Sequence, residues 1–295
     1  MSAHGAAPVV GRTPLAERVK GRLFQGAMLF SLGIGILALV TLLVQVFAKG
    51  SSRLNQDLLF HFPSGNPEIA GAQSAIWGTI WVISIVAFVT VPVGVGAAIY
   101  LEEYADRERW WNRLIELNIQ NLAAVPSIVY GILGLAFLVR GFANLGQTVL
   151  AGGLTLSLLV LPVVIISSRE AIRAVPDSIR QGSLALGATQ WQTIRRQVLP
   201  GAIPGVATGT ILALSRAIGE AAPLVLLGAL TFITFNPEGL DSAFTVLPIQ
   251  IFNWISRPQE EFKVLAAAAI VVLLVILVAM NAAAIYLRNR YQRKW

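Results

Sequence analysis

The chain has 295 residues, of which 56% are hydrophobic and only 13% are charged, and its mean hydropathy is +0.70. Because a water-soluble domain carries roughly 25% charged residues, this composition excludes one large soluble domain. The chain has no cysteine, and its two histidines, His4 and His61, have no second ligand at metal spacing, so disulfide bonds, a cysteine nucleophile and a metal site are not expected.

Six long apolar runs follow one another along the chain, and a membrane-spanning helix needs about 20 such residues. The runs cover residues 23–48, 69–101, 117–139, 141–168, 197–237 and 264–287. The first is longer than the roughly 7–15 apolar residues of a cleaved signal peptide, so we expect it to remain as a helix. The sequence predicts an all-α fold, a polytopic membrane helical bundle with six transmembrane helices.

Positive charges are distributed unevenly between the two sides of this bundle. With six spans both termini share one side, which carries sixteen Lys and Arg residues, whereas the other side carries five. The positive-inside rule then places both termini in the cytoplasm, with a tail at 1–22, a transmembrane domain at 23–287 and a tail at 288–295. The same asymmetry explains the net charge of +7 without nucleic acid as a partner.

Two segments between the runs, residues 49–72 and 231–263, are too long to be simple turns. The second contains an apolar stretch, residues 244–255, which includes Trp254. Such a stretch can lie on the membrane face or dip into the membrane as a re-entrant piece, or it can pack as a structured loop on the chain's own helices. The sequence leaves both possibilities open.

The acidic residues after the second run are Glu102, Glu103, Asp106 and Glu108. Arginines at 107, 109 and 113 alternate with them. We therefore interpret this region as a solvent-exposed loop between spans rather than as a cation site.

The cytoplasmic segment 169–200 predicts two short helices that meet at a glycine. Pro176 suits the first turn of a helix, and Gly187 suits its end. Thr189 and Gln192 match a capping box that starts the second helix, and Pro200 is expected to end it. Helices this short are marginal alone in water, so they must pack on the chain's own spans or on a partner protein.

Arg216 and Glu220 are the only ionisable residues inside a predicted span, and a spacing of four places them on one helix face. A charge at the centre of a bilayer costs at least about 2.5–3.5 kcal/mol. Since a guanidinium matches the oxygens of an oxyanion, the pair could border an anion path. Alternatively, it is an ion pair that only fixes helix packing.

None of the four lysines lies in a G-x-x-x-x-G-K-[ST] nucleotide-binding loop. ATP-driven transport would therefore need hydrolysis on another polypeptide.

The cytoplasmic segment resembles the loop of ABC importer permeases, whose pattern runs from Glu-Ala-Ala through a glycine to Leu-Pro. When the pattern is anchored on Leu199 and Pro200, its glycine falls on Gly187. This chain departs from the pattern at the isoleucine position, which is Gln197, and at the Glu-Ala-Ala positions, which are Gln181, Gly182 and Ser183.

Five further stretches are similar to the PstA-type permeases of phosphate importers. They are IYLEEYA (99–105), NLAAVPSIVYGILGL (121–135), LALGATQWQTIRRQVLP (184–200), RAIGEAAPL (216–224) and IFNWISRPQ (251–259). The resemblance implies the type I ABC permease fold and a non-catalytic subunit that forms half of a phosphate path in a bacterial inner membrane. It also implies that ATP-Mg is bound by a partner subunit and that this chain holds no cofactor.

The partners implied by the resemblance are a second, PstC-type permease, a PstB-type ATP-binding dimer and a PstS-type phosphate-binding protein. Arg216 and Glu220 would border the substrate path. Contact with the ATPase would involve Gln181, Gly182, Ser183, Gly187, Leu199 and Pro200. Two alternatives stay open: an ABC permease for another oxyanion, such as molybdate or sulfate, and an ion-gradient-driven transporter or channel that acts alone.

Overall fold

The computed structural model describes residues 15–106, 108–229 and 232–291, and most of these residues are helical. Five of their helices are long and apolar enough to cross a membrane, and one bent pair of helices brings the number up to six. The predicted all-α membrane bundle is therefore confirmed. Most of the predicted N-terminal tail (residues 1–14) and half of the C-terminal tail (292–295) lie outside the described residues.

The chain divides into two compact units, Met1–Ala48 and Lys49–Trp295. The first consists, where described, of helix α1 (Leu15–Gly50), which runs to the boundary and is apolar on all sides over its central part. This helix begins within the tail predicted at 1–22.

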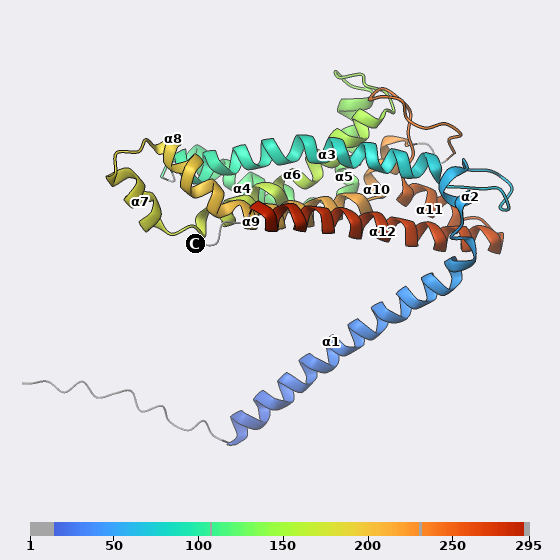
Figure 1. Ribbon diagram of the computed structural model, residues 1–295, viewed down its shortest axis with the longest axis horizontal. Coiled ribbons are helices and arrows are strands. Elements are labelled where there is room, and N and C mark those ends of the chain that lie inside the picture. The colour runs from blue at the N-terminus through green and yellow to red at the C-terminus, as the bar shows by residue number, and fades with distance from the viewer. Residues whose placement is uncertain (1–14, 107, 230–231, 292–295) are drawn as a thin grey trace, which may run out of the picture. The chain divides into compact units, whose positions relative to one another are not determined.

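The second unit holds the remaining helices (Figure 1). The long ones are α3 (Gln73–Ile99), α6 (Val149–Arg173), α9 (Leu199–Gly219) and α12 (Glu260–Tyr291). The shorter α-helices are α2 (Gln56–Phe60), α4 (Trp110–Ala124), α5 (Ser127–Leu133), α7 (Asp177–Ala185), α8 (Gln190–Thr193), α10 (Ala222–Leu227) and α11 (Leu247–Ile255). A 3-10 turn η1 (Ser51–Arg53) and three π-helical turns, η2 (Tyr100–Tyr104), η3 (Gly134–Val139) and η4 (Ile194–Val198), complete the fold.

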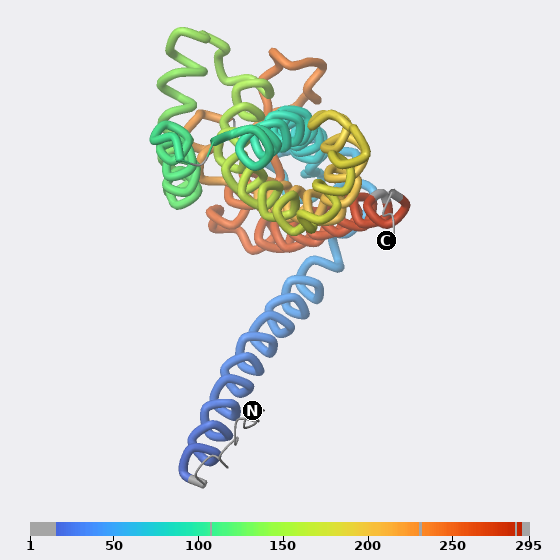
Figure 2. Tube along the Cα trace, turned by 90° about the vertical axis from the view of Figure 1, so that its left-hand side faces the viewer, coloured from blue at the N-terminus to red at the C-terminus, as the bar shows by residue number. Residues whose placement is uncertain are grey.

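The core of this unit lies where α6 packs against α3 on one side and α9 on another, and α9 packs in turn on α12. Figure 2 looks along these helices from the end that carries α7 and α8. Fully buried Val86 on α3 meets Val160 and Leu156 of α6 in one hydrophobic cluster. Burial of this apolar surface, rather than helix propensity, holds the helices together.

The third apolar run, predicted as one span, does not form a single helix. It is split into α4 and the segment α5–η3, and the two parts meet at an angle of 105°. The break lies at Val125 and Pro126, both in extended conformation. A proline disfavours helical conformation in the residue before it, which explains why the helix stops there.

The fifth run also differs from the prediction at both ends. Helix α8 continues through η4 into α9 without interruption, so Pro200 does not end the helix. In η4 the Leu199 N–H donates to the carbonyl of Ile194, five residues back, and this wider turn accommodates the missing N–H of proline. At the other end α9 stops at Gly219, before the predicted end of the run.

The apolar stretch 244–255 forms helix α11, which packs on α12 and α3. Trp254 is fully buried and belongs to a hydrophobic cluster with Leu58 of α2 and Phe262 of α12. This packing fits both possibilities left open by the sequence, because a segment that dips into the membrane must also be covered by protein.

Candidate functional site

Two regions of the chain carry the predicted site residues: the break after α9 and the α7–α8 hairpin. At the break, Nε of Arg216 lies 3.2 Å from Oε1 of Glu220. The arginine side chain is 45% exposed, and the glutamate side chain is 17% exposed. Glu220 has left the helical conformation, with φ −80° and ψ 110°. The two residues thus form an ion pair, which was one of the interpretations left open by the sequence, and the pair sits at a helix end rather than inside a continuous span.

The break between α4 and α5 lies beside the break after α9. The two breaks are close because α5 packs on α10, the helix that follows Glu220. A Cβ atom on Gly131 of α5 would come within 2.7 Å of the backbone of Pro223 in α10. Tyr130 spans the α4–α5 break, where its hydroxyl donates a 2.8 Å hydrogen bond to the carbonyl of Leu122. The two interrupted spans are therefore joined at the level of the Arg216–Glu220 pair.

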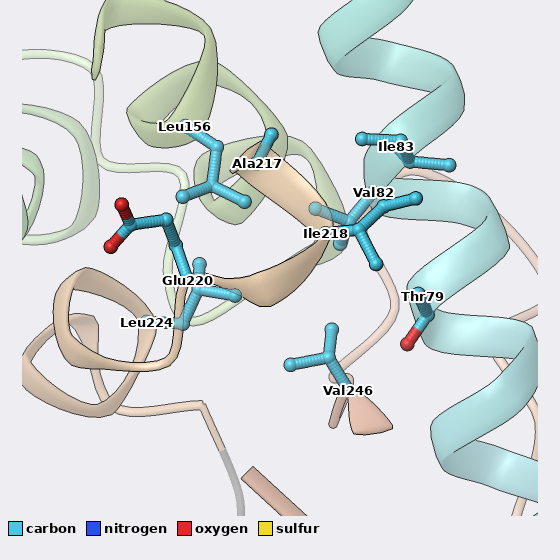
Figure 3. A pocket seen from close by; sticks show the side chains of 9 residues that line it. All are labelled: Thr79, Val82, Ile83, Leu156, Ala217, Ile218, Glu220, Leu224 and Val246. Atoms are coloured by element: carbon cyan, nitrogen blue, oxygen red, sulfur yellow. The ribbon is translucent and has the colours of Figure 1, made fainter. Parts of the chain in front are cut away.

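A small cavity borders Glu220, and its other lining residues come from α3, α6, α9, α10 and the segment before α11 (Figure 3). Its volume of about 10 Å³ has room for about one water molecule. In Figure 3 the Glu220 carboxylate points away from the side chains of Ile83 and Thr79. An oxyanion such as phosphate does not fit in this cavity.

The α7–α8 hairpin has the local structure that the sequence predicted. Thr189 and Gln192 form the capping box in both directions. Gly187 has φ +84°, a left-handed conformation that ends α7 and that other residues rarely adopt. Ser183 of α7 and Thr193 of α8 join the two helices through hydroxyl groups 2.9 Å apart.

The residues predicted for coupling fall into two groups. Gln181, Gly182 and Gly187 are exposed, and Leu186 at the tip is 91% exposed. The second group comprises half-buried Leu199 and Pro200 at the start of α9 and half-buried Ser183. Of the predicted coupling residues, the structure thus places Gln181, Gly182 and Gly187 on the open surface of the hairpin.

Glu102 and Glu103 are functional candidates that the sequence analysis missed. Their side chains are 3% and 9% exposed, so the interpretation of this region as a solvent-exposed loop is wrong for both. Glu102 receives two hydrogen bonds from Arg173, of 2.9 and 3.1 Å. Glu103 receives two from Arg180, of 3.1 and 2.9 Å. The partners of both carboxylates, Arg173 and Arg180, lie 71 and 77 residues later in the chain, so the local charge pattern gave no signal of these pairs.

Among the described residues no group of three or more His, Cys, Asp or Glu side chains is placed to hold a metal ion. The features that remain are an ion pair at a helix break, a hairpin with an exposed apolar tip, and a Glu–Arg network next to the hairpin with buried carboxylates.

Comparison with known proteins assigns the chain to a family. Residues 90–293 match the family described as binding-protein-dependent transport system inner membrane component. The chain is 32% identical to a probable ABC transporter permease protein, YqgI, of Bacillus subtilis, over 80% of this chain and 79% of that protein. It is also 32% identical to the phosphate transport system permease protein PstA 1 of Mycobacterium tuberculosis (strain CDC 1551 / Oshkosh), over 94% and 92% of the two chains.

Solved structures show the same fold at low sequence identity. A chain of a bacterial alginate ABC transporter matches with a TM-score of 0.68 and 16% identity, over 95% of this chain and 99% of that one. A chain of the MetNI methionine ABC transporter matches with a TM-score of 0.62, over 74% and 95%. The predicted ABC importer permease fold is confirmed, and the chain belongs to the family of binding-protein-dependent transport system inner membrane components.

Proposed function

We propose that this chain is the PstA-type permease subunit of an ATP-driven phosphate importer and forms half of the phosphate path across a bacterial inner membrane. The relatives support the substrate, because the Mycobacterium tuberculosis protein and a Mycobacterium leprae protein at 35% identity are both named phosphate transport system permeases. The family supports the role of a membrane component that works with a binding protein.

The structural observation that carries the proposal is the α7–α8 hairpin. Its tip residue Leu186 is 91% exposed, and Leu184 and Trp191 of the same hairpin are about half exposed. Exposed apolar side chains gathered in one region are typical of a contact surface for another protein. The second helix of the hairpin, α8, begins with its own capping box. The chain has no nucleotide-binding loop. These facts fit docking of the tip on a separate ATP-binding subunit, with ATP-Mg bound there.

The other partners follow from the same proposal. A second, PstC-type permease would supply the opposite wall of the path, and a PstS-type protein would deliver phosphate from outside. Both termini and the hairpin would lie in the cytoplasm, as the sixteen positive charges on that side favour.

Arg216 would line the path with its exposed face, while Glu220 moderates its charge so that the anion is attracted but not trapped. The 45% exposure of the arginine side chain in this single chain supports the role, because the exposed side is where a second permease and an anion would approach. Guanidinium stays charged and can offer paired donors to phosphate oxygens.

The first experiment identifies the partners. The tagged chain is purified from its bacterium in mild detergent, and the co-purifying subunits are identified and tested for ATP-dependent uptake of labelled inorganic phosphate in liposomes. We expect an ATP-binding subunit, a second permease and phosphate uptake that requires ATP and the binding protein. Phosphate uptake by this chain alone, driven by an ion gradient, would contradict the proposal, and uptake of molybdate or sulfate instead would contradict its substrate.

The second experiment tests Arg216. Arg216→Gln should lower phosphate uptake at least about tenfold, since a hydrogen bond to a charged group is worth roughly 1.5–3 kcal/mol, while the complex still assembles. Arg140→Gln, at an exposed arginine after η3, is the matched control and should transport normally. If Arg216→Gln assembles and imports phosphate at the wild-type rate, Arg216 is not on the path.

A further inference from the structure

The two helices of the hairpin are both bonded to a single residue at the end of α3. From α7, the guanidinium of Arg180 donates to Oε1 of Glu103 at 2.9 and 3.1 Å. From α8, the side-chain amide of Gln190 donates to the backbone carbonyl of Glu103 at 2.5 Å. Glu103 lies in η2, which directly extends α3. The hairpin and the end of α3 are therefore joined through Glu103 from both sides.

Arg180 also binds the end of α6. Its guanidinium donates to the carbonyl of Ile172 at 2.8 Å and to the carbonyl of Val175, and it pairs with Asp177 at 3.1 Å. The last carbonyls of a helix lack partners within the helix, and a cation is favoured at that end. One side chain of the hairpin thus fixes the ends of two spans, α3 and α6.

The neighbouring carboxylate fixes the same two spans and a third helix. Glu102 is paired with Arg173 and lies 3.5 Å from Nε of Arg169, both on α6. Arg169 pairs in turn with Glu116 of α4 at 3.0 Å. The ends of α3, α6 and α4 consequently form one ion network next to the hairpin.

Without the Glu103 carboxylate the hairpin would keep its covalent links and the bond from Gln190 to the backbone carbonyl of residue 103, but it would lose the ion pair with Arg180. Its first end continues α6 through Val175 and Pro176, and its second end is continuous with α9. Apolar contact with α3 runs through one small cluster that includes Ala98 of α3 and Val198 of η4. Apolar contacts have no preferred direction, whereas charge-assisted hydrogen bonds fix both distance and angle.

We infer that Glu103 is a positioning residue that transmits displacement of the α7–α8 hairpin to α3, so that α3 moves together with α6 and α9 when the partner ATPase closes. This inference rests on the proposed function. It assigns to the Glu103–Arg180 pair the task of coupling, separate from the passage of the substrate at Arg216. Without the Glu103–Arg180 pair, the ATPase would still hydrolyse ATP, but α3 would not move with the hairpin.

The test compares phosphate imported with ATP hydrolysed in the fully assembled transporter in liposomes, with labelled inorganic phosphate and the binding protein. For Glu103→Gln we expect this ratio to fall about tenfold, a typical size for coupling between distant sites, with ATP hydrolysis largely retained. A residue that only stabilises the fold would lower both activities together and leave the ratio unchanged. Glu108→Gln makes the same change at an exposed carboxylate of the same acidic run and should keep the wild-type ratio.

A second variant, Gln190→Ala, keeps the Glu103–Arg180 ion pair and removes only the bond from α8 to the Glu103 carbonyl. It tests the inference even if the Glu103→Gln complex does not assemble. We expect its ratio to fall about threefold, below the loss for the charged contact because neutral hydrogen bonds are weaker. A wild-type ratio in either assembled variant overturns the inference. A wild-type complex that hydrolyses ATP but imports no phosphate overturns the proposed substrate instead.

Discussion

At the scale of single residues, close packing at Gly131 decides whether the two interrupted spans can meet. The glycine lies in α5, and the backbone of Pro223 in α10 approaches it from the opposite side. Backbone atoms cannot rotate away as the end of a flexible side chain can. The junction next to the Arg216–Glu220 pair therefore depends on the absence of a side chain at this position.

Gly131→Ala should lower the thermal midpoint of the detergent-solubilised chain, because its Cβ would lie 2.7 Å from Pro223 Cα. Overpacking of this kind costs typically about 1–3 kcal/mol. Gly96→Ala is the matched control: it lies inside α3 with no atom within 4 Å of the new Cβ. The control should stabilise the chain, since alanine is the better helix former by roughly 1 kcal/mol. Equal midpoints for the two variants would contradict a tight junction.

The burial and the partners of single side chains were also the features least predictable from the sequence. The Arg216–Glu220 pair was predictable, because a spacing of four on a helix brings side chains together. Burial of Glu102 and Glu103 was not, because Asp106 and Glu108 belong to the same acidic run and remain exposed. The difference arises from arginines about 70 residues later in the chain, such as Arg173 and Arg180, and local charge pattern carries no information about such contacts.

At the scale of elements, the start of α8 depends on one side chain. The hydroxyl of Thr189 accepts from the Gln192 N–H, and the Gln192 side chain accepts from the Thr189 N–H. This reciprocal bonding satisfies donors that the first turn of a helix leaves without partners. The cap acts together with the Ser183–Thr193 contact and the backbone bond from Ala188 to the carbonyl of Ser183 to order the turn.

Thr189→Val has nearly the same shape and removes the capping oxygen. The change should cost about 1 kcal/mol, so amides in 190–193 should exchange with deuterium about fivefold faster, while the thermal midpoint of the bundle stays the same. Mass spectrometry of hydrogen exchange measures this, with Thr189→Ser as the control that keeps the cap. Equal exchange in the two variants would mean that the cap does not order the hairpin.

The helix breaks show how far elements follow from sequence. The end of α7 at Gly187 and the capping box were predicted correctly, since both depend on residues within one turn. The break at Pro126 was missed, although the proline was visible, because a proline in an apolar run can kink a helix or end it. Pro200 was wrongly expected to end a helix, since the wider turn of η4 absorbs its missing N–H.

At the scale of the whole molecule, the proposed orientation can be tested because the chain has no native cysteine. Ser178→Cys, exposed on α7, should react with a membrane-impermeant maleimide only in inside-out vesicles. Ser256→Cys, exposed just after α11, should react only in right-side-out vesicles. Ser157→Cys, buried in α6, is the control and should react only after denaturation. Labelling of the first two from the same side would contradict the proposed topology.

The overall architecture was the part most open to prediction. Runs of apolar residues report membrane-spanning helices directly, because every backbone polar group in a bilayer must be satisfied within the helix. Packing of α11 on α12 and α3 was not predictable, since an apolar stretch of that length suits a re-entrant segment equally well. Such choices depend on contacts between parts of the chain that are distant in sequence, for example Trp254 with Leu58.

The uninterrupted helix from Gln190 to Gly219 has a mechanical consequence. Its 30 residues form a rod about 45 Å long at 1.5 Å per residue. It starts in the hairpin and ends beside Glu220. Tilting a rod of that length by about 5° shifts its far end by roughly 4 Å, more than the length of an ion-pair contact. A small swing at the tip is thus enough, by leverage alone, to open or close the space around the Arg216 guanidinium.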